Sequence, residues 1–352
     1  MIGDFALLNS ELKRLKLDAL VTDVTENTFY ITSYINEDCL IVVKRDRIYY
    51  LTDKRYTLEA KHFLNPHIQL VEISDDPSEA LIKILSDCSQ IGFEDKMQYA
   101  TYYKLFVKNR IKAIPVSDFL KPCRMIKNVA EKALIAHAAS INDRTYEIIL
   151  NSIREGITER EVRDIAESSF RRFGADGIAF ETIVAFGENA AEPHHHVSDR
   201  RLKHGDCILI DMGCKTKGYC SDVTRTFFFG AVDNNKKMLY NKVLDCNRLA
   251  VDMLSDGVDA FDIATEVRNS FRRDGLDTYF THSLGHGVGI QIHEAPYLSL
   301  RSSDTLQSGN VVTVEPGLYF AGDFGVRIED LLYVDNGGAE CLSKFDRGFI
   351  QL

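Results

Sequence analysis

The chain has 352 residues, 45% of them hydrophobic, so it can bury a large core, and its length favours two domains over one. Acidic residues outnumber basic ones by 52 to 42, and the net charge of −10 argues against nucleic acid or an anionic membrane as a partner. No apolar run of about 18 residues is present to span a membrane. Charged residues such as Glu11 interrupt the start too early for a signal peptide, so we expect a cytoplasmic protein.

The first 120 residues alternate between helix and strand patterns. Residues 10–17 are typical of the end of an amphipathic helix, and another helix is expected to begin near Asp76 and Pro77. Apolar alternation predicts strands at residues 19–23, 39–43, 47–53, 67–73 and 90–94. This part of the chain is therefore predicted to be a compact α/β unit.

The pattern breaks around Lys121–Cys123, because Pro122 disfavours helix in the residue before it, and a long helical stretch is predicted from about Met125. We place a domain boundary there, which gives an N-terminal α/β domain at 1–122 and a second domain at 123–352.

Helices in the second domain have clear sequence boundaries. Thr158 and Glu161 predict a capping box at the start of one helix, and Gly174 is a suitable residue just beyond its end. Two more helices are expected, within residues 235–256 and after Asp259. Strands are predicted at residues 207–213, 219–230, 311–317 and 325–334. Helices interleaved with hairpins, rather than strict βαβ alternation, favour an α+β fold.

Two of the predicted hairpins contain pairs of acids. If the first turns near Thr216 and Lys217, Asp211 and Asp222 are directly opposite and project from the same face, with Cβ atoms roughly 5 Å apart. The same arithmetic about Gly322 places Glu315 opposite Glu329. Acids inside apolar strands repel one another unless a cation neutralises them, so four converging carboxylates predict a dinuclear metal site.

Histidines form the second cluster. Seven of the ten fall between positions 194 and 293, and the stretch HSLGHGVGIQIH contains His282, His286 and His293. Its glycines favour a loop over a helix, so it differs from the helical zincin motif, which also needs a glutamate after its first histidine. The eight cysteines show no C-x-x-C pair, so we expect reduced structural thiols and no zinc ribbon.

Together these motifs resemble a known family. The segments IDMG, YCSDVTRTF, HSLGHGVGIQIHE, VEPGLYF and GVRIED, in this order, resemble the metallopeptidases of the aminopeptidase P, prolidase and methionine aminopeptidase group. The segment LTDKRY at 51–56 is similar to the N-terminal domain of the proline-peptidase branch, which methionine aminopeptidases lack. The resemblance implies a pita-bread catalytic domain after a smaller α/β domain of the creatinase and prolidase type, and commonly a homodimer.

By position, the resemblance implies a ligand set for two divalent ions. Asp211 chelates one ion, Asp222 and Glu329 bridge both, and His286 and Glu315 complete the second. Four carboxylates and one imidazole favour Mn²⁺, with Co²⁺, Zn²⁺ and Fe²⁺ as alternatives. A hydroxide bridging the two ions is then the nucleophile, and Glu315 passes its proton to the leaving nitrogen.

The resemblance also implies further catalytic residues. His194, which follows Pro193, and His293 line the substrate site and stabilise the tetrahedral intermediate, while the two histidines after His194 are ordinary loop residues. His282 lies near the site, and Arg327 orients nearby acids through charge-assisted hydrogen bonds.

We therefore expect an exopeptidase that cleaves Xaa-Pro bonds in short peptides with proline at the second position. Aminopeptidase P, which acts on longer peptides, and prolidase, which accepts only the dipeptide, are both open. One alternative is a creatinase-like amidine hydrolase, which does not rely on the metal ligands. The other is a non-catalytic peptide-binding protein. Retention of all five ligands argues against both alternatives.

Overall fold

The computed structural model describes residues 5–74 and 76–352 and divides the chain into two compact units, Met1–Arg124 and Met125–Leu352. Residues 1–4, part of the start of the chain examined above for a signal peptide, lie outside the described residues. Among the described residues, no helix combines the length and the apolar character needed to cross a bilayer.

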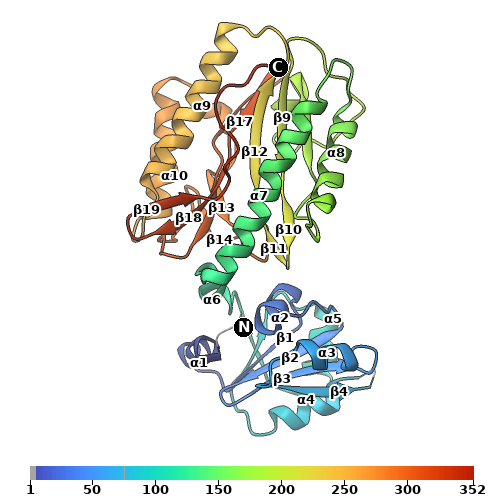
Figure 1. The fold of residues 1–352 in the computed structure, drawn as a ribbon. Coiled ribbons are helices and arrows are strands. Elements are labelled where there is room, and N and C mark those ends of the chain that lie inside the picture. Colours follow the sequence, from blue (N-terminus) through green and yellow to red (C-terminus); the bar gives the residue numbers. More distant parts are fainter. Residues whose placement is uncertain (1–4, 75) are drawn as a thin grey trace. The chain divides into compact units, whose positions relative to one another are not determined.

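Unit 1 is built on one mixed sheet, coloured blue to cyan in Figure 1. In sheet order, its described strands are β4 (Ile68–Ile73), β3 (Ile48–Asp53), β2 (Cys39–Lys44), β1 (Ala19–Thr22), β5 (Ile91–Glu94) and β6 (Ile114–Val116). The helices of unit 1 are α1 (Phe5–Arg14), α2 (Thr25–Thr32), α3 (Thr57–Phe63), α4 (Ser78–Leu85) and α5 (Tyr99–Tyr102). Every predicted strand of this part is present, and β2 and β3 form an antiparallel hairpin.

The prediction that Pro122 interrupts the helical pattern at Lys121–Cys123 is wrong, because these residues begin a short helix, α6 (Lys121–Met125). Pro122 lies in its first turn, where a missing N–H costs no intrahelical hydrogen bond. The long helix begins later than expected, at Val129, because Asn128 and Glu131 form a capping box.

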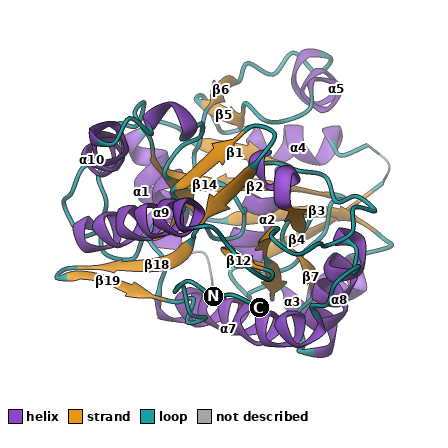
Figure 2. Cartoon of the chain, turned by 90° about the horizontal axis from the view of Figure 1, so that it is seen from above, coloured by secondary structure: helices purple, strands orange, loops and turns teal. Residues whose placement is uncertain are grey.

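Unit 2 repeats one plan twice, with two helices followed by strands (Figure 1). The first half has α7 (Val129–Ser152), α8 (Glu159–Arg172), and the strands β7 (Gly177–Ile178), β8 (Ile183–Phe186), β9 (Cys207–Met212), β10 (Cys214–Thr216), β11 (Tyr219–Cys220) and β12 (Val223–Phe228). The second half has α9 (Asn234–Met253), α10 (Ala260–Arg273), and the strands β13 (Gly285–Gly287), β14 (Glu294–Leu298), β15 (Val311–Val314), β16 (Gly317–Phe320), β17 (Phe324–Arg327), β18 (Asp330–Asp335) and β19 (Gly338–Cys341). Helices α9 and α10 lie side by side in both views (Figure 1, Figure 2).

Sequence signals place these helices well. Thr158 and Glu161 form the predicted capping box of α8, and Gly174 adopts the left-handed conformation just beyond it, with φ of +93°. Asp259 precedes α10 as expected, but its side chain accepts a hydrogen bond from Thr305 instead of capping the helix.

Alternation along the strands separates two cores in unit 2. Ile208 and Ile210 of β9 pack with α7 and α8, whereas Cys207 and Leu209 pack in the core that contains α9 and α10. Asp211 continues the second series, since side chains two residues apart share a face. The strand therefore directs this acid toward the interior where the two halves meet.

Candidate metal centre and active site

The first acidic hairpin has a register different from the predicted one. Its turn is at Lys217 and Gly218, which both have positive φ (46° and 81°), as a two-residue type I′ turn requires. Asp211 consequently pairs with Thr224, not with Asp222. Moving the turn by one residue shifts each pairing by two positions, and a shift of two preserves the face. Both aspartates therefore still project from the same side, as diagonal neighbours.

The second acidic hairpin has the predicted register. Val314 pairs with Asp330 and Gly317 with Arg327, so Glu315 and Glu329 are opposite in the interval between these pairs. The chain reverses around Gly322, which has φ of +75°. The two hairpins meet where the Glu329 N–H donates to the carbonyl oxygen of Thr224 at 3.1 Å.

All four acids line a cavity of about 990 Å³ in unit 2. The described residues that line it also include His194, His282, His286, His293 and Arg327, so it contains every catalytic and ligand residue proposed from the sequence. Apolar side chains, among them Ile178, Phe180, Ile183 and Ile292, form part of its wall. The wall can therefore contact an apolar ligand while the polar groups meet a reacting bond.

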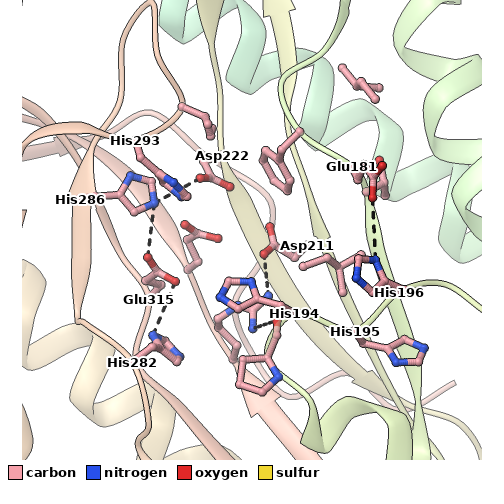
Figure 3. A pocket seen from close by; sticks show the side chains of 18 of the residues that line it. Glu181, His194, His195, His196, Asp211, Asp222, His282, His286, His293 and Glu315 are labelled. Carbon is pink, nitrogen blue, oxygen red and sulfur yellow. Dashed lines mark hydrogen bonds and ion pairs between the residues drawn. The ribbon is translucent and has the colours of Figure 1, made fainter. Parts of the chain in front are cut away.

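His286 lies between two of the acids, as Figure 3 shows. Its Nε2 is 3.6 Å from Oδ2 of Asp222 and 3.5 Å from Oε1 of Glu315. Its Nδ1 is 3.1 Å from the carbonyl oxygen of Gly287, an acceptor, so Nδ1 has the proton and Nε2 presents a lone pair to the acids. Burial lowers the pKa of His286 to about 3, which keeps the ring neutral. The lone pairs of Nε2 and of the two carboxylate oxygens therefore face one another at 3.5 to 3.6 Å, a separation that suits a cation bound between them.

Ligand geometry supports the same conclusion. One donor atom each from Asp222, His286 and Glu329 lies within 4.8 Å of the others. The buried Oδ1 of Asp211 accepts no hydrogen bond from any residue that the structure describes. A buried acceptor without a partner is costly, and a cation would satisfy it. The residues present therefore fit divalent metal ions with hard oxygen ligands.

The acids are also electrostatically strained against one another. Burial, and then the charges of Glu329, Asp211 and Glu315, raise the pKa of Asp222 well above its usual value. Burial and the charges of Glu315 and Asp211 raise the pKa of Glu329 in the same way. Burial raises the pKa of Glu315 to about 8. A bound cation would reverse this destabilisation by favouring the ionised forms.

A hydrogen-bond network orients the acids. Arg327 donates through NH2 to Oδ2 of Asp211 at 2.6 Å and through Nε to Oγ1 of Thr224 at 3.1 Å. Thr224 in turn donates to Oε2 of Glu329 at 2.6 Å. Arg327 is thus bonded directly to Asp211, and Thr224, whose role the sequence did not settle, connects it to Glu329.

Tyr319 was missed as a site residue, although it lies in the motif VEPGLYF. Its hydroxyl accepts from NH1 of Arg327 at 2.9 Å and is 2.8 Å from Nε2 of His282. The Nδ1 of His282 is 2.7 Å from the carbonyl oxygen of Ser283, so this nitrogen has the proton and Nε2 accepts from Tyr319. His282 therefore belongs to the network around Arg327.

The other histidines differ in their surroundings. The ring of His293 is perpendicular to that of His286, with centroids 4.2 Å apart, and burial lowers the pKa of His293. His195 is bound on both ring nitrogens, by Glu159 at 3.0 Å and Glu192 at 3.1 Å. The side chain of His196 is 93% exposed. Figure 3 shows His194 beside Asp211, on the side of the cavity where the acids lie.

Glu159, which the sequence did not single out, fixes this histidine loop. It accepts hydrogen bonds from Ser198 and from the N–H of Phe186, in addition to its contact with His195. It lies in the first turn of α8, where a carboxylate also interacts favourably with the helix dipole. The capping signal at Thr158 located the start of this helix, but it did not reveal that Glu159 contacts His195 and Ser198, some 40 positions later.

Each of the eight cysteines is a free thiol, and all eight lie among the described residues. Six are buried, and none lines the cavity. That these cysteines are reduced structural thiols stays a prediction.

Comparison with known families agrees with this site. The model of metallopeptidase family M24 matches residues 133–336, and the model of the creatinase/prolidase N-terminal domain matches residues 6–126. The two matches correspond to unit 2 and unit 1. The predicted α+β fold, with a smaller N-terminal α/β domain, is thereby confirmed.

Individual relatives cover almost the whole chain. A Xaa-Pro dipeptidase of Pyrococcus horikoshii is 31% identical over 354 residues, 98% of this chain and 99% of that protein. The solved structure of a Xaa-Pro dipeptidase from Bacillus anthracis is 32% identical, covers 99% of both chains and has a TM-score of 0.96. An X-Pro aminopeptidase from Thermotoga maritima is 30% identical, covers 97% of this chain and 99% of its own, and has a TM-score of 0.89.

Proposed function

Because this chain belongs to metallopeptidase family M24, we propose that it is a metal-dependent exopeptidase that hydrolyses Xaa-Pro bonds in short peptides. The observation that supports this most is the set of four acids, two of them buried, and one neutral imidazole in the cavity. Such a set, rather than the fold alone, distinguishes a hydrolytic metal site from a binding module.

The residues suggest how two ions are held. Asp211 would chelate one, His286 and Glu315 would hold the other, and Asp222 and Glu329 would contact both. We favour Mn²⁺ because the donors are mostly carboxylate oxygens. When bound, such ions would supply a hydroxide nucleophile by lowering the pKa of water and would polarise the scissile carbonyl. Arg327 holds Asp211 and, through Thr224, Glu329 in the required orientation.

Proton transfer and oxyanion stabilisation fall to groups in the cavity. Glu315 has one oxygen near Nε2 of His286 and the other 3.9 Å from Nδ1 of His282. From this position it can accept the proton of the nucleophilic water and pass it to the leaving nitrogen. His293 is neutral and can donate an N–H to the developing oxyanion without a change of charge. His194, which lies beside Asp211 in the same cavity, serves the same end.

Proline suits this site for a chemical reason. The nitrogen of an Xaa-Pro bond has no hydrogen, so the enzyme needs no acceptor for it, and the pyrrolidine ring is apolar. Ile183 and Ile292 offer apolar wall on which such a ring can pack. Relatives named as Xaa-Pro dipeptidase and as X-Pro aminopeptidase match at similar identity, so both peptide lengths must be tested.

Metal dependence is the first test. Protein stripped with a chelator should not cleave an Xaa-Pro dipeptide or an Xaa-Pro-Xaa tripeptide, and Mn²⁺ or Co²⁺ should restore cleavage. The same protein assayed on creatine, with and without metal, examines the creatinase-like alternative. Equal turnover of peptide before and after chelation contradicts the proposal, and binding of peptide without any turnover favours the non-catalytic alternative.

Substrate length is the second test. The metal-loaded protein is incubated with a dipeptide such as Ala-Pro and, separately, with Ala-Pro-Ala, and the products are identified by mass spectrometry. Cleavage of the dipeptide alone identifies a prolidase, whereas release of the first residue from the tripeptide identifies an aminopeptidase P. Cleavage after proline in the tripeptide contradicts the proposed specificity.

A further inference from the structure

A buried ion pair lies outside the cavity but next to residues that line it. Nζ of Lys127 is 2.9 Å from Oε1 of Glu294, and the two side chains are only 1% and 7% exposed. Neither residue lines the cavity. Glu294, however, directly follows His293, and Lys127 comes just before α7. The pair therefore joins residues 167 positions apart without contacting the reacting groups.

Glu294 is placed to fix both neighbouring histidines. It pairs with Gly287, which follows His286, at a point where the register between β13 and β14 is irregular. Such irregularities re-aim the side chains beside them. The backbone of Gly287, which follows His286, is thus held opposite Glu294, which follows His293.

The carboxylate of Glu294 packs tightly inside this loop. A Cβ on Gly289 would lie 2.3 Å from its Oε1, so a larger residue at 289 would have to displace this carboxylate. The N–H of Gln291 points to Oε2 of Glu294 at 3.4 Å. The Gly289 carbonyl oxygen accepts from the N–H of Cys220 at 2.8 Å, two residues before Asp222. One carboxylate therefore lies at the centre of the backbone around His293 and close to the acidic hairpin.

The other end of the pair is also fixed. The N–H of Lys127 donates to the carbonyl oxygen of Gly309 at 2.8 Å, and the side chain of Asn310 donates to the carbonyl oxygen of Met125 at 3.1 Å. The ammonium group thus extends from an anchored backbone. It acts as a fixed point against which the loop from 288 to 294 is held.

We propose that the Lys127–Glu294 ion pair positions His293 for the hydrolysis proposed above. Buried ion pairs are costly to desolvate and add little stability over an apolar pair of the same volume, so stability alone does not account for this one. The pair acts through the loop, and its loss should lower kcat because a small displacement of a group that meets the transition state is expensive. This inference rests on the proposed function for the effect on kcat, but not for the position of the ring.

The test removes both charges together. The double variant Lys127→Met/Glu294→Gln keeps the volumes and leaves no unpaired buried charge, so it should fold. Lys127→Arg keeps the pair and is the conservative variant. The matched control is Lys132→Met/Glu340→Gln, because that pair (2.7 Å) likewise joins distant parts of unit 2, here α7 and β19, but its side chains are 27% and 54% exposed. Should the double variant fold poorly, Glu294→Asp provides the comparison, because it keeps both charges and withdraws the carboxylate by one methylene.

Two measurements are made on each variant. In chelated protein labelled with ¹³C-histidine, the ring signals of His293, assigned by their loss in His293→Gln, should shift or broaden in the double variant and stay unchanged in the control. With Mn²⁺ and an Xaa-Pro peptide, kcat should fall by about tenfold or more while KM changes by less than about threefold. Lys127→Arg should restore kcat.

The outcomes separate the two proposals. Unchanged His293 signals, or a kcat within about twofold of wild type, overturn the positioning role. A fall in kcat that the control variant shares, or that tracks a lowered melting temperature in every variant, also overturns it. A wild-type protein that cleaves no Xaa-Pro peptide overturns the proposed function, and the ring signals still decide whether the pair positions His293.

Discussion

Replacing Thr224 by valine removes one hydroxyl from the network and leaves the shape of the side chain almost unchanged. The hydroxyl is fully buried on β12; it accepts from Nε of Arg327 and donates to Oε2 of Glu329. In the variant, a guanidinium loses an acceptor and a carboxylate loses a donor, both inside the protein. Glu329 is then free to rotate away from the position that binding two ions requires.

The expected size follows from the two lost bonds. Hydrogen bonds to charged groups contribute about 1.5 to 3 kcal/mol each, so the free energy of unfolding of the metal-free protein should fall by about 3 to 6 kcal/mol. In a domain of this size that lowers the melting temperature by roughly 6 to 24 °C. Loss of a group that orients a metal ligand typically weakens metal affinity by about 10- to 100-fold, so we expect that loss for Mn²⁺.

Thr226→Val is the matched control, since Thr226 is two residues further along the same strand and equally buried. Its hydroxyl bonds the backbone of Arg327, at 2.9 Å and 3.2 Å, and contacts no acid. Calorimetric titration with Mn²⁺ and thermal unfolding are measured for both variants. The control should lose about 1 to 2 kcal/mol of stability but no metal affinity. An equal loss of affinity in both variants, or none in Thr224→Val, refutes the reasoning.

Three further predictions concern the same cavity. Asp222→Asn removes a buried carboxyl group whose pKa is raised, so the metal-free variant should be at least as thermostable as wild type at pH 8. Mn²⁺ should no longer raise its melting temperature. A normal metal-induced rise contradicts the bridging role. The folded-state pKa of Glu315, about 8, exceeds its usual 4.5, so the folded state binds the extra proton and the metal-free protein should lose stability as pH rises from 4.5 to 8. Glu315→Gln should flatten that melting curve against pH, and an unchanged slope argues against this carboxyl as the source. Tyr319→Phe breaks the contact between Arg327 and His282, so kcat should fall about tenfold while the metal content measured by mass spectrometry stays at the wild-type value; loss of metal would place Tyr319 among the groups that hold the ions.

Local patterns explain why the sequence located the acids well. The register between Glu315 and Glu329 depends on one turn, and the glycine at 322 identifies its centre. The turn after Asp211 was displaced by one residue, because Lys217 adopts a positive φ that non-glycine residues seldom take. Even so, the strand period of two kept Asp211 and Asp222 on one face.

Local sequence patterns do not predict the conformation of irregular loops or the contacts between distant segments. A run of three histidines has no periodicity, so only the structure shows that Glu159 engages His195 and that the side chain of His196 points to solvent. Tyr319 stood in a recognised motif, but its hydroxyl acquires a role only where two distant segments bring Arg327 and His282 to it.

The sequence by itself determined the long helices of unit 2, the strands that contain the four acids, the face on which each acid projects and the chemical nature of the ligand set, because these depend on neighbours within a few residues. Only the tertiary structure decided how the aspartate hairpin meets the glutamate hairpin, which hydroxyl connects Arg327 to Glu329, and that Lys127 lies against Glu294. Those contacts join residues about 100 or more positions apart. Chain periodicity contains no information about them, since they arise from the packing of whole strands and helices.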